Sequence, residues 1–212
     1  MGTLVDLTVS AFGAEVASDS PAPGGGSAAA LAGSVAAGLV TMVCRLSLGR
    51  DDVAAGDDEL SEALERSERL RRRLLELVDE DTAAFAAVMD AVRLSKADEA
   101  QRAARRTALQ AATLGAAAVP LETLMMARET LQLAASLAGR TNPGTASDLG
   151  VAVQLARAGA EGALLNVAIN LASLPEGDIG DAERRQAREE IAVARSAAAA
   201  AEAVVARSLA LD

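Results

Sequence analysis

Apolar residues recur every three or four positions along most of the chain, which is the pattern of helices that bury one face. The clearest stripe lies in residues 57–94 and comprises Leu60, Leu64, Leu74, Leu77, Phe85, Val88 and Val92. Short polar or Gly/Pro-rich stretches separate the periodic segments. The pattern predicts helices over residues 3–17, 27–48, 57–94, 99–138, 148–171 and 182–209. The fourth is expected to bend or restart at Pro120, because proline removes a helical hydrogen bond.

The composition also favours helices over strands. The chain has 212 residues and is 51% apolar, yet Phe12 and Phe85 are its only aromatic residues. Alanine, leucine, arginine and glutamate favour helices, whereas strands favour β-branched and aromatic residues. Every break between segments is short, so we expect residues 1–212 to form one all-α domain, a bundle of six to seven helices with two long central ones. Small residues at spacing four (Ala29, Gly33, Ala37) predict a close helix contact.

The charge pattern makes nucleic acid an improbable partner. The formal net charge is −10, and the one basic run, Arg71–Arg73, alternates with acidic residues as a solvated helix face does. The N-terminal residues lack the positive charge and apolar stretch of a signal peptide. A single cysteine, Cys44, fits a reducing compartment. We therefore expect a cytoplasmic protein.

Residues 21–44 carry no charge over a length that can span a bilayer. The middle of this segment is alanine, glycine and serine, which gain little on transfer to lipid. A central helix wrapped by the others explains the same residues better, and no membrane partner is expected.

Three consecutive glycines, Gly24 to Gly26, precede Ser27, which is predicted to cap the second helix. A glycine-rich turn at a helix start suits an anion, but the lysine of a phosphate-binding P-loop and the preceding strand of a dinucleotide site are missing. Two interpretations stay open. The stretch is either a plain loop with a good cap, or a backbone that must lie bare against a ligand, since glycine loses more entropy on folding than other residues.

Asp81 falls on the apolar stripe of the third helix, where leucine is expected. A carboxylate there is either paired with an arginine or a helix cap, or has a raised pKa that suits acid-base chemistry. Asp79 and Glu80 are expected to face solvent.

Two further polar groups are candidates for a site. Asn142 is held out of the helical region by the following proline, and Thr145 or Ser147 can cap the next helix with Asp148 in its first turn. Asn166 and Asn170 share a helix face among apolar residues. They can hold a polar heterocycle, or they can join two helices.

The chain has no histidine, which excludes Ser-His and Cys-His nucleophilic pairs and histidine metal sites. No facing carboxylate clusters are evident, so no metal site is expected, and Cys44 is interpreted as a core residue. Proton transfer must therefore use carboxylates, water or nitrogens of the substrate.

Four segments, in this order and spacing, resemble the cyclodeaminase domain of the formiminotransferase-cyclodeaminase family, whose relatives include stand-alone methenyltetrahydrofolate cyclohydrolases. They are "SPAPGGGSAAALAG" (20–33), "DEDTAAF" (79–85), "NPGTASDLGVA" (142–152) and "GALLNVAINL" (162–171). The resemblance covers nearly the whole chain. It implies an all-helical homodimer or larger homo-oligomer with folate sites at or near the subunit interface.

The resemblance implies an enzyme acting on the one-carbon unit at N5 and N10 of tetrahydrofolate, with no cofactor beyond that substrate. Asp81 and Asp148 are the implied catalytic residues. The implied substrate-binding residues are Gly24, Gly25, Gly26, Ser27, Asn142, Ser147, Asn166, Asn170 and Arg50. Arg45 and Arg140 are further candidates for the glutamate tail. The alternative is a non-catalytic folate-binding or scaffold relative.

The chain departs from the family in one turn. Family members often carry a turn with lysine and tyrosine after the glycine-loop helix. Here that turn reads "LGRDDVAAGDD" (48–58), in which Arg50 is the one cation. The resemblance therefore leaves open whether the chain is a cyclodeaminase or a cyclohydrolase.

Overall fold

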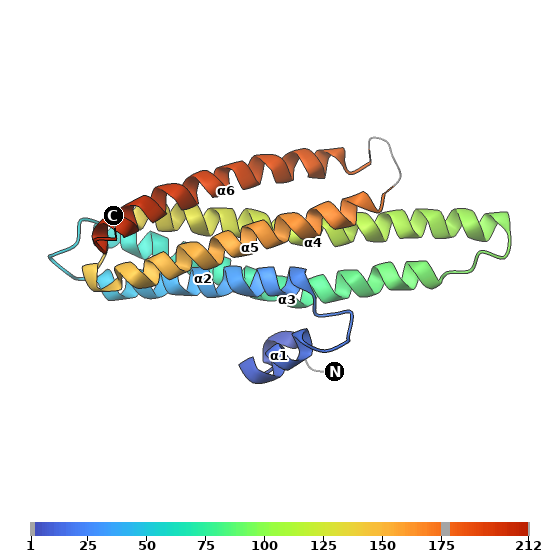
Figure 1. Ribbon diagram of the computed structural model, residues 1–212, viewed down its shortest axis with the longest axis horizontal. Helices are drawn as coiled ribbons and strands as arrows, with labels where there is room; N and C mark the ends of the chain where they lie inside the picture. The colour runs from blue at the N-terminus through green and yellow to red at the C-terminus, as the bar shows by residue number, and fades with distance from the viewer. Residues whose placement is uncertain (1–2, 175–178, 212) are drawn as a thin grey trace.

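A computed structural model describes residues 3–174 and 179–211. Within these ranges, five long helices lie side by side, each antiparallel to the one before, and a short N-terminal helix flanks them (Figure 1). The long helices are α2 (Gly25–Ser47), α3 (Asp57–Arg93), α4 (Glu99–Leu137), α5 (Ala146–Ala172) and α6 (Asp181–Ser208). The predicted all-α bundle with two long helices is confirmed.

Helix α2 lies between α3 and α5, while α4 packs against α3, α5 and α6. Alanine and leucine dominate the buried surface, as the composition predicts. The backbones of α2 and α5 touch, because a Cβ built on Gly159 would lie 2.9 Å from Ala29 O and 3.2 Å from Gly33 N. This contact confirms the close approach predicted from the small residues of α2.

By length and composition, α2 and α4 are each apolar enough to cross a membrane. In α2, 61% of the most apolar window is buried inside the bundle, and in α4 the share is 39%. The burial of α2 by its neighbours favours its interpretation as a core helix.

The N-terminal segment differs from the single helix predicted over residues 3–17. It forms a 3-10 turn, η1 (Leu4–Asp6), and then α1 (Val9–Val16), whose N-cap Thr8 accepts a hydrogen bond from Ala11 N. None of its residues is buried, although Leu4 and Phe12 pack against α2 and α3. The predicted solvent position of Asp79 is wrong, because its Oδ1 accepts from Leu4 N at 2.6 Å.

Helix α4 does not restart at proline, since it runs unbroken from Glu99 to Leu137 with Pro120 buried inside it. The bounds of α2, α5 and α6 differ from the predicted ones by one or two residues. Before α5, residues Pro143–Thr145 form the 3-10 turn η2. Neither predicted cap acts as one, because the Thr145 side chain makes no capping bond and Ser147 lies inside α5.

The apolar stripe of α3 is buried only in its first half. Leu60, Leu74 and Leu77 are fully buried, whereas Phe85 and Val92 are more than a third exposed. The cause is visible in Figure 1, where α3 and α4 project beyond the start of α2. The second half of α3 therefore has no α2 to cover it.

Candidate functional site

A cavity of about 370 Å³ opens where α2 begins, within the size range of small-molecule sites. Four helices meet there: α2 contributes its glycine-rich start, α3 contributes Asp81, α4 contributes Ala116, and α5 contributes two asparagines. The lining residues are Pro21, Ala22, Gly24, Gly25, Gly26, Asp81, Phe85, Val88, Ala116, Asn166, Ile169, Asn170 and Ser173. The structure thus brings Asp81 together with five other predicted site residues, namely Gly24, Gly25, Gly26, Asn166 and Asn170.

Asp81, on the neighbouring helix α3, supplies the side-chain acceptor that caps the start of α2. Helix α2 begins at Gly25 with Gly24 as its N-cap, so the predicted capping role of Ser27 is wrong. Instead, Ser27 N donates to Asp81 Oδ2 at 2.9 Å. A carboxylate at this place meets an unsatisfied N–H group and the positive end of the helix dipole.

Gly26 is a glycine because Asp81 occupies the space of a side chain. A Cβ built on Gly26 would lie 2.1 Å from Asp81 Oδ1, far closer than any real contact. By contrast, a Cβ on Gly25 would meet Asn166 Nδ2 at 3.4 Å, an ordinary contact, and one on Gly24 would meet nothing within 4 Å. Of the three glycines, only Gly26 is required by its neighbours in the folded chain.

Burial raises the pKa of Asp81 above its usual range, and the hydrogen bonds from Ser27 oppose the shift. No arginine pairs with Asp81 among the residues that the structure describes, which removes the buried ion pair as an explanation. Ser27 is fully buried behind Asp81, and its Oγ lies 3.0 Å from Asp81 Oδ2 and 2.9 Å from Val78 O.

This arrangement accommodates both protonation states of Asp81. When the carboxyl is ionised, the Ser27 hydroxyl can donate to it. When the carboxyl is protonated, it can donate to Ser27 Oγ while the serine proton turns to Val78 O, because a hydroxyl is both donor and acceptor. A carboxyl that is hydrogen-bonded in either state suits proton transfer.

Asn166 and Asn170 line the same cavity, as their spacing predicts. Asn166 Nδ2 donates to Gly162 O at 2.9 Å, and Asn170 Nδ2 donates to Ala116 O at 2.6 Å. Ala116 O is the carbonyl that residue 120 would bond in a regular helix, and Pro120 has no N–H to donate. Asn170 thus supplies the donor that the proline withholds.

The wall of the cavity is rich in hydrogen-bond acceptors. Each asparagine uses its amide nitrogen on a protein carbonyl, and within residues 3–174 and 179–211 neither Oδ1 accepts a hydrogen bond. Both hydrogen bonds to the Asp81 carboxylate likewise fall on Oδ2. The Asn and Asp81 side-chain atoms left for a ligand are therefore oxygens, which favour a ligand edge that carries several N–H donors.

The remaining predicted residues lie at the opposite end of the bundle. Asn142 Nδ2 donates to Leu46 O at 3.1 Å, and its Oδ1 accepts from Gly144 N at 2.9 Å. Leu46 is in the last turn of α2, whereas the cavity lies at the first turn, and the helix between them is roughly 33 Å long. Ser147 and Asp148 follow in the first turn of α5. Their roles stay predictions, and a single chain does not bring them to Asp81.

The arginines proposed for the glutamate tail are at that far end too. Arg50 pairs with Asp52 at 2.7 Å, and Arg140 pairs with Glu59 at 2.6 Å. Arg45 is in the last turn of α2. Within one chain, none of the three reaches the cavity beside Asp81.

Other groups play no part in this cavity. Glu80 keeps a partly exposed side chain, as expected, and pairs with Arg73, which also pairs with Glu122 of α4. Cys44 is fully buried, and burial raises its pKa to about 11, so the thiolate that a nucleophile requires is disfavoured. Within the described ranges, no three acidic or cysteine side chains gather closely enough to hold a metal ion.

Sequence reasoning missed several residues of the wall. Phe85 and Val88 were predicted to lie in the core, and Ala116 and Ser173 were not predicted to line a site, although all four do. Pro120 was interpreted only as a helix breaker, although it frees the carbonyl that anchors Asn170. A proline inside an otherwise regular helix, opposite a buried amide, is the signal that could have indicated this contact.

The chain matches the family model described as formiminotransferase-cyclodeaminase over residues 8–189. The chain belongs to this family. Its likeness to a methenyltetrahydrofolate cyclohydrolase from Methylorubrum extorquens is 41% identity over 169 residues, which cover 80% of this chain and 81% of that protein. The resemblance inferred from the four sequence segments is therefore confirmed.

Larger relatives and a solved structure agree with this family. The formimidoyltransferase-cyclodeaminase of Rattus norvegicus is 34% identical over 174 residues, which are 82% of this chain and 32% of that protein. The chain therefore spans about a third of that longer relative. The crystal structure of formiminotetrahydrofolate cyclodeaminase from Thermotoga maritima superimposes with a TM-score of 0.79 at 26% identity, covering 97% of this chain and 96% of that one.

Proposed function

We propose that this member of the formiminotransferase-cyclodeaminase family is a folate-dependent enzyme acting on the one-carbon unit between N5 and N10 of tetrahydrofolate. The observation that carries the proposal is Asp81, a half-buried carboxyl with a raised pKa at the start of α2, in a cavity walled by amide oxygens. The names of the cyclohydrolase and cyclodeaminase relatives support the same substrate class.

The acceptor-rich wall suits the pterin ring. The amino group and ring N–H groups of a pterin form a donor edge, which matches the Oδ1 atoms of Asn166 and Asn170. A ring held there lies beside Asp81 and against the exposed face of Phe85. The bare backbone of Gly25 lets the ligand approach the helix start, where anionic and carbonyl oxygens are favoured.

Asp81 serves as the proton carrier in either reaction. In cyclodeamination, N10 bonds to the carbon of the protonated formimino group, and Asp81 moves the proton of N10 to the nitrogen of that group. The bond from the carbon to this nitrogen then breaks, so that ammonia leaves and the methenyl cation bridges N5 and N10. In cyclohydrolysis, water bonds to the carbon of the methenyl cation and gives one proton to Asp81, which passes it to the ring nitrogen whose bond to that carbon breaks. The second proton of the water is released to solvent as the formyl carbonyl forms. Both reactions are acid-base chemistry, and neither needs a cofactor beyond the folate.

The decisive experiment measures turnover of 5-formiminotetrahydrofolate and of 5,10-methenyltetrahydrofolate by the absorbance of the methenyl chromophore. Formation of the chromophore from the first substrate identifies a cyclodeaminase, and accelerated loss of it from the second identifies a cyclohydrolase. Folate binding without either reaction would establish the non-catalytic alternative, and an absence of binding would leave a helical scaffold.

We also propose that two copies associate through the face formed by α2 and α5. Five large apolar side chains are 48–70% exposed along this face: Val35, Leu46, Val151, Leu165 and Ile169. They extend from the cavity at one end of the bundle to the Asn142 loop at the other. Arg45 is the one charged residue of α2, and the α5 charges Arg157 and Glu161 turn to partners on α6. A continuous apolar face of this kind favours association.

An antiparallel pairing of the two copies of α2 would bring the distant site residues together. A two-fold axis perpendicular to the helices would set the first turn of α2 in one copy beside the last turn of α2 in the other. The Asn142 loop and Asp148 of the partner would then approach the cavity that holds Asp81. The site implied by the family resemblance would be completed between two subunits.

A further inference from the structure

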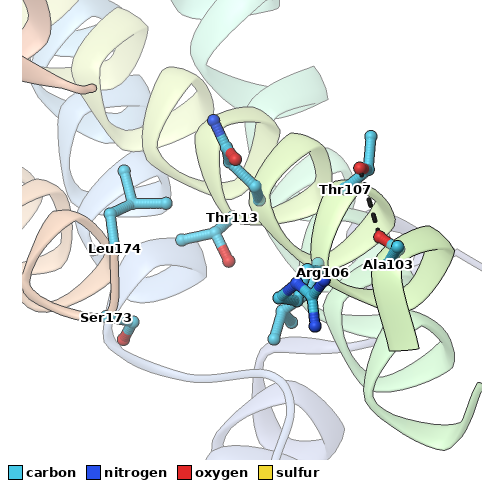
Figure 2. A pocket seen from close by; sticks show the side chains of 8 residues that line it. Ala103, Arg106, Thr107, Thr113, Ser173 and Leu174 are labelled. Atoms are coloured by element: carbon cyan, nitrogen blue, oxygen red, sulfur yellow. Dashed lines mark hydrogen bonds between the residues drawn. The ribbon is translucent and has the colours of Figure 1, made fainter. Parts of the chain in front are cut away.

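A second cavity, of about 410 Å³, lies between α4 and the end of α5 (Figure 2). Ser173 lines both cavities, and Thr113 of the second is one helical turn from Ala116 of the first. The other lining residues are Ala103, Arg106, Thr107, Leu109, Gln110 and Leu174. The two neighbouring cavities are together called the groove here, with Asp81 lining the first and Arg106 lining the second.

The groove exists because the helices start at different levels. Helix α2 begins beside Asp81, while α3 and α4 continue past it as a projecting hairpin (Figure 1). The end of α5 faces this part of α4, and Figure 2 shows Ser173 and Leu174 across the space from Thr113 and Arg106. An elongated ligand held at Asp81 therefore has space to extend along this opening.

The polar character changes along the groove. Around Asp81 the wall offers carboxylate and amide oxygens, whereas the far part offers the Arg106 guanidinium, the Thr107 and Thr113 hydroxyls and the Gln110 amide. Thr107 Oγ1 donates to Ala103 O. The positive charge of Arg106 at this end favours an anionic group of the ligand.

Arg106 can turn to a ligand while its present partner, Glu99, stays paired with another arginine. Its Nη2 lies 3.2 Å from Glu99 Oε1, but Glu99 Oε2 also accepts from Arg102 Nε at 3.0 Å. The hydrogen bonds of Arg102 and then Arg106 lower the pKa of Glu99, which stays ionised and paired with Arg102 when Arg106 moves. An exposed arginine of this kind exchanges partners at little cost.

We propose that this second cavity binds the glutamate tail of the folate, with Arg106 receiving a tail carboxylate while the pterin ring lies beside Asp81. The inference rests on the proposed function and adds to it the direction in which the substrate lies. Within one chain, Arg106 is thus the proposed partner of the tail in place of Arg45, Arg50 and Arg140, which were expected to bind it. Arginine suits this role, since its planar guanidinium matches a carboxylate in a bidentate pair.

The test compares substrates that differ only in the tail. Steady-state kinetics are measured with whichever of 5-formiminotetrahydrofolate and 5,10-methenyltetrahydrofolate the native protein turns over, as the monoglutamate and the triglutamate. Binding is measured with a reduced pterin that has no benzoylglutamate. Arg106→Ala should raise KM for both tailed substrates about 10-fold, leave kcat unchanged, and leave the affinity for the tail-less pterin as in the native protein. Added salt should shrink the difference.

Two further variants separate a tail contact from a folding defect. Gln110→Glu keeps the shape of the side chain and adds a negative charge in the cavity, so it should raise KM for tailed substrates as well. Arg69→Ala is the control, because Arg69 is an exposed arginine on α3 whose nearest carboxylate, on Glu65, is 3.9 Å away. It should change neither parameter.

The outcomes discriminate between the two proposals. Native kinetics for both tailed substrates in Arg106→Ala, or an equal loss for tailed and tail-less ligands, overturns the tail site while the proposed function stands. If the native protein neither binds nor turns over any of the folates, the proposed function fails and the tail site fails with it.

Discussion

Asn170 donates a hydrogen bond to Ala116 O, the carbonyl that the ring of Pro120 leaves without its helical partner. The bond joins α5 to α4 at the wall of the cavity and orients the Asn170 amide, so that its oxygen is left for a ligand. A helix irregularity and a binding group are therefore parts of one arrangement.

A double-mutant cycle tests this arrangement. Asn170→Ala removes the donor to a nearly buried carbonyl, which should lower the free energy of unfolding by about 1–3 kcal/mol. In the Pro120→Ala background the same change should be milder, because the new N–H can bond Ala116 O within the helix. Urea unfolding of the two single variants and the double variant measures the coupling. Strictly additive effects would show that the proline and the amide are independent.

Asp81→Asn tests the proton carrier. The amide is isosteric and its oxygen can still accept from Ser27 N, so the fold should be retained. Turnover should fall by ~10²–10⁴, the usual contribution of general acid-base catalysis. The measurement pairs the rate with circular dichroism and melting temperature. A well-folded variant with native turnover would exclude Asp81 from the chemistry.

The same variant makes a prediction for the pH dependence of stability. Burial raises the pKa of Asp81 in the folded chain above its value of about 3.9 in an unfolded one. Its favourable contribution is thus complete below the unfolded pKa and is lost as pH rises through the folded pKa. Asp81→Asn cannot ionise, so its melting temperature relative to the native protein should increase from pH 4 to pH 8. A difference that stays constant over this range would contradict the raised pKa.

The three glycines should respond differently to alanine. Gly26→Ala must displace the Asp81 carboxylate and should lower turnover about 100-fold, as a 1 Å misplacement does. Gly25→Ala should fold normally and raise KM, since its methyl group enters the cavity beside Asn166. Gly24→Ala is the matched control and should change stability by less than about 1 kcal/mol. Equal effects at all three positions would indicate that the glycines serve the loop alone.

Leu165→Glu tests the proposed interface. Leu165 is 70% exposed on α5, so a charge there leaves the single chain intact and opposes burial against a second copy. Light scattering at micromolar concentration should give a dimer mass for the native protein and a monomer mass for this variant. Val193→Glu, at a 43% exposed position on α6, is the control and should remain dimeric. A monomeric native protein would refute the interface.

The helical bundle could be predicted because hydrophobic periodicity is a local property. The start of α3 at residue 57 and its apolar first half follow directly from the spacing of leucines. The second half could not be predicted, because the exposure of Phe85 depends on where α2 begins. Ser27 was assigned as a cap from its position after the glycines, whereas the actual cap comes from Asp81, 54 residues away.

The candidate site was predicted only in part, because local patterns indicate single residues but not which distant residues meet. Asp81 stood out as a polar residue on an apolar stripe, and Asn166 and Asn170 stood out by their shared face. The grouping of Asn142 and Asp148 with them came from the family resemblance, and a single chain places these residues at the other end of α2. The second cavity has no sequence signal, since Arg106 is one of many arginines on exposed helix faces.

The contact between Gly26 and Asp81 makes the residue allowed at position 26 depend on the residue at position 81. As long as residue 81 carries a carboxyl in this position, residue 26 has no room for any side chain. A lineage that abandons the chemistry is freed from that restriction and can accept alanine or serine at residue 26, with a shorter residue at 81. On the proposal that Asp81 carries the proton, the two positions together offer a criterion for sorting the members of the family, separating chains that keep this carboxyl from those that retain only the bundle.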